Sequence, residues 1–136
     1  TPFVADFLGE SNLFKGTVVA SQAGQARVAL NGTNTELLAS ADQPLATGAK
    51  VSVMVRPQNM AAAAAAQGAS QRFSGQLMDT MITGSLTKLY LKAPALSTEP
   101  VVLSFPISIA KHDHALGSTL DFGWSSSDAV AVPEPA

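Results

Sequence analysis

Apolar and polar residues alternate along most of the chain in short runs that end at glycine or proline. In the clearest run, residues 51–56, Val51, Val53 and Val55 alternate with longer or polar side chains, and Pro57 follows. This period of two predicts a strand with one buried face, which ends where proline removes a hydrogen-bond donor. The same pattern predicts further strands at residues 13–21, 26–30, 35–39, 72–81, 86–92, 101–105, 120–124 and 130–132.

Short polar segments between these runs predict turns. Ala23-Gly24-Gln25 and Thr83-Gly84-Ser85 each separate neighbouring strands and predict hairpins. Asn31-Gly32 is the preferred sequence of a type I′ turn, so we expect a tight hairpin there as well. Each half of the chain is therefore predicted to begin as a meander of antiparallel strands.

The two halves repeat the same pattern. Phe14, Gly16 and Val18 have residues of the same kind 59 positions later. A second set of five positions recurs at equal spacing near the end of each half: Gly48, Val51, Val53, Val55 and Asn59, and then Gly117, Leu120, Phe122, Trp124 and Asp128. We interpret the chain as two degenerate copies of one β unit, residues 13–59 and 72–132. The fold class is therefore all-β.

The alanine-rich segment 60–71 lies between the two copies. Its six consecutive alanines favour a helix, but it has no apolar stripe to anchor one and Gly68 interrupts it. We expect a linker with at most transient helix. Residues 133–136, with two prolines, are expected to be a frayed tail.

The N-terminal residues predict a short helix. Phe3, Phe7 and Leu8 fall on one side of segment 2–9, which has proline near its start and glycine at its end. Such a short helix is marginal alone, so its apolar face must dock on something. Because Thr1 is not a methionine and no signal-peptide pattern follows, we expect further residues to precede it.

Composition excludes several classes of protein. The 136 residues fit one compact domain or two halves that share a core, and the absence of cysteine excludes disulfides and thiolate metal sites. The net charge of -2 argues against binding nucleic acid, which needs clustered Lys and Arg. No run approaches the roughly 20 apolar residues that span a bilayer. A soluble, cytoplasmic protein is the simplest expectation.

Chemistry-bearing residues are scarce. His112 and His114 are the two histidines of the chain, and the sequence shows no third ligand beside them, which even a catalytic zinc site needs. We expect them on a solvated loop, with no metal and no cofactor bound. Two histidines in one loop also provide no separated base and orienting group for a nucleophile, and no phosphate-binding glycine loop is present. Enzyme activity is not expected.

Two residues are candidates for an interface or regulatory role. Arg56, at the end of a strand, could hold a carboxylate of a partner or could lie over the barrel surface. Trp124 occupies the position of Val55 in the other copy, which indicates a core residue, but its indole N–H would need a partner if buried, so an interface role stays open. Glycines inside predicted strands, Gly16, Gly75 and Gly123, indicate bulges or close backbone approach.

Residues 3–14 (Phe-Val-Ala-Asp-Phe-Leu-Gly-Glu-Ser-Asn-Leu-Phe), Gly16, segment 53–58 (Val-Met-Val-Arg-Pro-Gln) and the closing segment 117–132 together resemble a known family. The chain is similar to the C-terminal TOBE (transport-associated OB) region of ABC importer ATPase subunits. The wording around residues 9–14 looks most like the polyamine (spermidine/putrescine) importers and their iron(III) relatives. The family often has an acidic residue where this chain has Gln58.

The resemblance implies a fold, partners and a location. The fold would be interleaved OB-type β-barrels, with residues 1–12 as the C-terminal edge of a nucleotide-binding domain that lies outside this chain together with its ATP and Mg²⁺. The region would hold two ATP-binding subunits together as a homodimer and would meet permease subunits through the parent protein, at the inner face of the membrane. In some members it accepts a regulatory protein or small ligand.

Three functions remain open from the sequence. The first is the regulatory and dimerisation module that the resemblance implies. The second is a small-ligand receptor of OB type, binding an oxyanion or the transported solute. The third is a single-strand nucleic-acid binder, which is disfavoured because one Tyr, one Trp and an acidic balance provide neither a basic groove nor stacking aromatics.

Overall fold

The computed structural model describes residues 11–106 and 114–134 and confirms an all-β protein. The predicted helix 2–9 lies outside the described residues. The strands are β1 (Asn12–Gln22), β2 (Gln25–Leu30), β3 (Glu36–Ser40), β4 (Lys50–Val55), β5 (Ala61–Ala62), β6 (Gln71–Thr83), β7 (Leu86–Lys92), β8 (Val101–Pro106), β9 (Thr119–Trp124) and β10 (Ala129–Pro133). Three 3₁₀ helices join them: η1 (Pro57–Asn59), η2 (Ala63–Gly68) and η3 (Ser126–Asp128).

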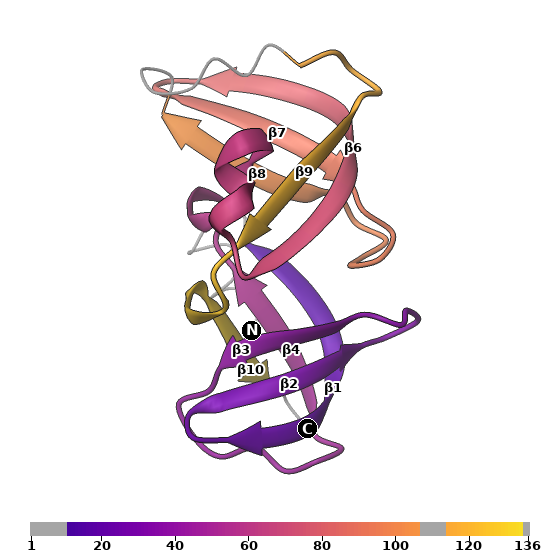
Figure 1. Cartoon of the computed structure of the whole chain (residues 1–136), viewed down its shortest axis with the longest axis vertical. Coiled ribbons are helices and arrows are strands. Elements are labelled where there is room, and N and C mark those ends of the chain that lie inside the picture. Colours follow the sequence, from indigo (N-terminus) through magenta and orange to yellow (C-terminus); the bar gives the residue numbers. More distant parts are fainter. Residues whose placement is uncertain (1–10, 107–113, 135–136) are drawn as a thin grey trace.

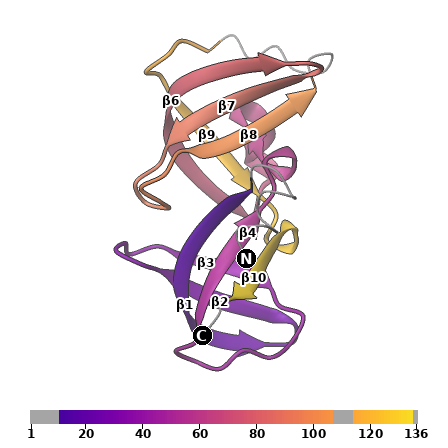
Figure 2. The same ribbon diagram turned by 180° about the vertical axis from the view of Figure 1, so that it is seen from behind.

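The strands form two lobes, one above the other in Figure 1. The lower lobe is a closed five-stranded barrel in the order β1-β2-β3-β10-β4. The upper lobe is a five-stranded sheet in the order β5-β9-β6-β7-β8, with η2 beside it. Strands β1 and β4 rise from the barrel to the junction, as the view from behind shows (Figure 2).

After its closing strand, each half continues into a strand that pairs in the sheet of the other half. β10 follows β9 along the chain but pairs with β4 from Ala129↔Val55 to Pro133↔Val51, so the C-terminal segment lies in the first barrel (Figure 1). β5 follows β4 but pairs with β9, Ala61 with Gly123. This exchange interleaves the two halves, because neither sheet is complete without a strand from the other.

The strand registers confirm the internal repeat. β1 pairs with β4 through Phe14↔Val53, and β6 pairs with β9 through the corresponding Phe73↔Phe122. Both first hairpins have a register shift at the same place, at Val19 in β1 and at Met78 in β6. The two halves are therefore structural copies strand by strand.

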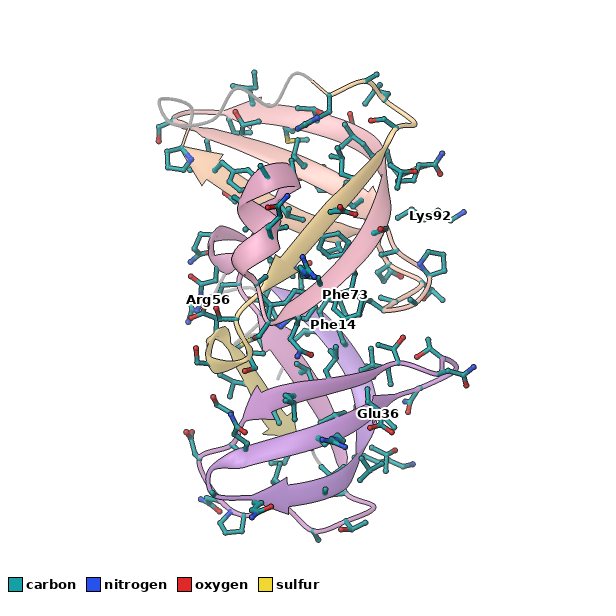
Figure 3. The ribbon with its side chains drawn as sticks, viewed as in Figure 1. Phe14, Glu36, Arg56, Phe73 and Lys92 are labelled. Carbon is teal, nitrogen blue, oxygen red and sulfur yellow. The ribbon has the colours of Figure 1, made fainter. Side chains whose placement is uncertain are left out.

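The core follows the predicted alternation. Val51, Val53 and Val55 are fully buried, as are Leu77, Leu89 and Leu91 in the second half. The buried residues of both halves belong to one hydrophobic cluster. Trp124 is 1% exposed and stacks on Phe14 of β1 and Phe73 of β6, with ring centroids 5.7 and 5.3 Å apart. Figure 3 places Phe14 and Phe73 at the junction of the lobes, so aromatic rings join the two cores.

Amide side chains also join the halves at two corresponding positions. The Asn12 Nδ2 donates to the carbonyl oxygen of Val102 at 2.8 Å, and the Val102 N–H donates to Asn12 Oδ1 at 2.8 Å. Gln71, the equivalent of Asn12 in β6, accepts from the N–H of Leu38 at 3.3 Å. Each amide thus bonds to the backbone of the third strand of the opposite half, and Asn12 uses both its donor and its acceptor, as a peptide group would.

The predicted type I′ turn at Asn31-Gly32 is wrong. The type I′ turn lies at Ala23-Gly24, where both residues have positive φ (50° and 79°), whereas Asn31-Gly32 has positive φ only at glycine and belongs to a longer connection. A hydrogen bond from the Leu30 N–H to the carbonyl oxygen of Thr35, at 2.9 Å, closes the connection 31–35 instead. The loop lengths, two residues against five, decide the turn type.

The alanine-rich segment is more structured than its composition suggests. Met60, Ala62 and Ala66 are buried, Ala61–Ala62 form β5, and residues 63–68 form a 3₁₀ helix, where at most transient helix is predicted. The small side chains permit close packing against β9, which supplies the anchor that the sequence lacks. The boundaries of the predicted domains stay a prediction.

Candidate functional site

The site begins where the second half departs from the first. In the first half, β10 continues for five residues along β4. In the second, β5 stops after Ala62 because Ala63 takes a positive φ of 55°, which turns the chain out of the strand and into η2. Positive φ is uncommon for alanine, so this bend marks a locally strained position.

Gly123 lets η2 and its exit cross β9. A Cβ added at this glycine would collide with the carbonyl oxygen of Gln71 and lie 3.0 Å from the Cβ of Ala69. Only glycine allows this close backbone approach. The predicted close backbone approach is confirmed at Gly123, and also at Gly16, where an added Cβ would lie 2.5 Å from the carbonyl oxygen of Ala29.

A pocket of 460 Å³ lies between η2 and the outer face of β6 and β9. Two alanines and Gln67 line it on η2, and three polar side chains and Phe73 line it on the two strands. The lining residues are Ala63, Ala66, Gln67, Arg72, Phe73, Ser74 and Asp121. Its position beside Phe73, which stacks on Trp124, connects it to the junction of the lobes.

The rim carries one cation and one anion that do not form an ion pair. Arg72 is exposed, and it makes no ion pair within the described part of the chain. In the sheet register Arg72 lies opposite Gly123, while Ser74 lies opposite Asp121. The Ser74 Oγ donates to Asp121 Oδ1 at 3.0 Å, so the carboxylate is held by the hydroxyl. A guanidinium with unused donors therefore borders the pocket.

The first half has different residues at the corresponding positions. The repeat aligns Arg72, Ser74, Asp121 and Gly123 with Leu13, Lys15, Ser52 and Met54. Leu13 and Met54 place apolar side chains where the second half has an arginine and no side chain at all. Since both halves fold into the same strand pattern, the fold does not require the polar rim.

Other hollows offer less to a ligand. A pocket of 400 Å³ over β1 and β2 contains Arg27, but its Nε lies 3.8 Å from Glu36 Oε1, so its charge is already paired. A groove of 220 Å³ between loop residues 41–45 and β10 contains Asp42 and mainly apolar side chains. Neither combines an unpaired cation with several donors.

The two residues singled out from the sequence lie elsewhere. Arg56 is half-buried at the end of β4, next to η1, at the height of the junction in Figure 3. Trp124 is buried between the lobes, and its Nε1 has no hydrogen-bond acceptor among the described residues. Neither Arg56 nor Trp124 lines the pocket between η2, β6 and β9. Their predicted interface or regulatory role stays a prediction.

The histidine loop is described only in part. His112 lies outside the described residues, while His114 is half-buried. Among residues 11–106 and 114–134, no cluster of three or more His, Cys, Asp or Glu side chains could hold a metal ion. No helix in the same part of the chain is long and apolar enough to cross a bilayer.

Comparison with known proteins gives a structural match. No protein-family model and no curated protein sequence matches the chain. A solved structure does match, that of the cytoplasmic molybdate-binding protein ModG with molybdate bound. The fold resembles that of ModG. The TM-score is 0.73, the match covers 90% of this chain and 96% of ModG, and sequence identity is 17%. At this identity the likeness establishes the fold, a closed five-stranded barrel with a second five-stranded sheet, and not the location of a site.

Sequence reasoning missed the rim residues Arg72, Ser74 and Asp121. They face outward on half-buried strands, where polar side chains are expected and carry no signal. One signal was available, because Gly123 stands where the strict repeat has Met54. A glycine that breaks an internal repeat indicates a place where the two copies have different surroundings.

Proposed function

We propose that this chain is a non-catalytic binding module that takes a small oxyanion into the pocket between η2 and strands β6 and β9. Arg72 would hold the anion through its planar fork, with Gln67 as a second donor. The unpaired guanidinium of Arg72 carries this proposal, because the first half folds without such a residue.

The expected affinity is modest. Hydrogen bonds to charged groups contribute about 1.5–3 kcal/mol each, and the rim residues are exposed, so water competes for them. Two or three such bonds correspond to a Kd on the order of 0.1–1 mM. A site of this strength would respond to a solute that is abundant and would not sequester a trace one.

The likeness to ModG supports the ligand class. ModG is a binding protein for molybdate, a small oxyanion, and has the same tandem fold. A protein of this fold can therefore hold a small anion. This supports a receptor in preference to an enzyme, and it leaves the position of the site to the residues of this chain.

Calorimetric titration with molybdate, sulfate and phosphate at constant ionic strength tests the proposal. We expect at least one ion to bind the wild type with millimolar or better affinity, and Arg72→Ala to weaken its binding at least tenfold. Arg27→Ala, which removes an exposed and already paired arginine, is the matched control and should leave binding unchanged. Equal binding by wild type and Arg72→Ala, or no binding of any ion, would refute the proposal.

A second candidate is the regulatory and dimerisation domain of an ABC importer ATP-binding subunit, of the polyamine or iron(III) branch. The wording of residues 3–14 and 53–58 favours it, and it would make a second ATP-binding subunit and the permease the partners of the parent protein. The two candidates are compatible, because a domain that joins subunits can also sense a solute. Lasting contact between two barrels would keep paired ATPase domains at high effective concentration.

Sedimentation across a concentration series tests this second candidate. We expect a dimer that Arg56→Ala weakens, since Arg56 is partly exposed and available to a partner. Trp124→Ala is a poor probe because the residue is buried, and Trp124→Phe is preferable. A monomer at every concentration would place dimerisation outside these residues.

A further inference from the structure

We infer that the pocket selects an oxyanion that carries an acidic proton of its own, as phosphate does, over one that carries none, such as sulfate or molybdate. This inference rests on the proposed function and adds to it the class of anion. The observation behind it is the carboxylate of Asp121 on the same rim as the unpaired Arg72.

The hydrogen bond between Ser74 and Asp121 fixes what each offers to a ligand. Ser74 has one hydroxyl proton and gives it to Asp121 Oδ1 at 3.0 Å. The hydroxyl therefore has no proton left for an anion. Asp121 can accept further hydrogen bonds, because an ionised carboxylate has about four lone-pair sites. Asp121 therefore accepts protons from a ligand, whereas Arg72 on the same rim and Gln67 on η2 donate them.

An anion in this pocket must therefore satisfy both kinds of neighbour. Sulfate and molybdate at neutral pH have only acceptor oxygens, which would face the Asp121 carboxylate without a proton between them. Phosphate retains at least one P–O–H, which can donate to Asp121 while its other oxygens accept from Arg72. At Asp121, phosphate gains a charge-assisted hydrogen bond where sulfate or molybdate meets repulsion, which amounts to roughly a tenfold preference.

The acid has no evident structural duty that would explain its place. Its equivalent in the first barrel is Ser52, which lies opposite Lys15 in the same register. Asp121 is exposed and makes no ion pair within the described residues. Its hydrogen-bond partner, Ser74, is itself exposed, so the bond between them contributes little to the stability of the fold. Discrimination between anions is a role that matches its position.

Titration calorimetry with four anions provides the test. Phosphate and arsenate carry a proton, and sulfate and molybdate do not. They are compared at neutral pH and constant ionic strength on the wild type, Asp121→Asn and Glu99→Gln. The asparagine retains an oxygen that Ser74 can donate to and adds an amide donor. Glu99→Gln removes an exposed carboxylate from another part of the surface and controls for net charge.

We expect the wild type and Glu99→Gln to bind phosphate and arsenate at least tenfold more tightly than sulfate and molybdate. Asp121→Asn should lose this preference, chiefly through tighter binding of sulfate and molybdate. If the wild type binds all four alike through Arg72, or if Asp121→Asn keeps the wild-type ratio, the selectivity is refuted while the oxyanion site stands. If no anion binds, or Arg72→Ala leaves all affinities unchanged, the site and the selectivity fail together.

Discussion

The first half closes its barrel and the second does not, although corresponding strands follow one another in the same order in both. The difference comes from the exchanged strands. β10 extends for five residues along β4, whereas β5 has only two residues and ends before Ala63. The freed chain becomes η2, which packs on β9 and forms a pocket wall, and its exit residue Ala69 lies over Gly123. The copy that departs from the common pattern is therefore the copy in which we place the function.

The buried residue at the end of each closing strand should show the largest difference between the halves. Trp124 stacks on Phe14 and Phe73 and joins the two cores, whereas Val55 at the same position is a small aliphatic residue. We expect Trp124→Ala to lower the free energy of unfolding by about 3–5 kcal/mol, and Val55→Ala by roughly half of that. Urea unfolding measures both.

Trp124→Phe separates packing from the unpaired indole N–H. It keeps an aromatic ring and removes a buried donor that has no acceptor in the described structure. We expect a loss of less than about 1.5 kcal/mol, since the volume change is partly offset by the donor removed. A loss as large as that of Trp124→Ala would show that the indole nitrogen contributes a hydrogen bond.

The in-strand glycines provide a smaller contrast. A Cβ on Gly16 would lie 2.5 Å from the Ala29 carbonyl oxygen, which is backbone and cannot move aside. On Gly75 it would lie 3.1 Å from Leu91 Cβ and from the Phe122 ring, which can shift slightly. We expect Gly16→Ala to cost about 3 kcal/mol and Gly75→Ala about 1 kcal/mol. Equal losses in thermal unfolding would contradict the close approach at Gly16.

The first hairpin turn should give the smallest effect. Ala23 and Gly24 both have positive φ, as a type I′ turn requires, and asparagine tolerates this conformation better than alanine. We expect Ala23→Asn to stabilise the protein by about 0.5 kcal/mol. In the second half only Gly84 of the turn has positive φ, so Ser85→Asn should have no effect in the same unfolding assay.

Alternation along the chain was enough to predict the strands but not their partners. The period of two assigns Val53 and Phe122 to a buried face, and each lies there, because burial depends on residues within one strand. It cannot show that β10 leaves β9 and pairs with β4, since that depends on how far the chain continues after η3. The internal repeat correctly predicted two copies and a core position for Trp124.

The pocket could not be predicted from the sequence for a related reason. Arg72 and Asp121 are 49 positions apart and come together only through the pairing of β6 with β9. The wall of the pocket needs η2, which the alanine-rich composition predicted only as a linker. Its order comes from burial of Ala62 and Ala66 against the second half, a tertiary effect that helix propensity does not contain.

The central claim is that an anion binds the second half and not the first, and NMR titration of ¹⁵N-labelled protein with phosphate tests it most directly. The account predicts shifts of the Arg72 side-chain N–H and of the Gln67 and Ser74 amides, with the amides of the equivalent Leu13 and Lys15 unchanged. Shifts confined to the first barrel or to the Arg56 region, or no shifts at millimolar phosphate, would contradict it.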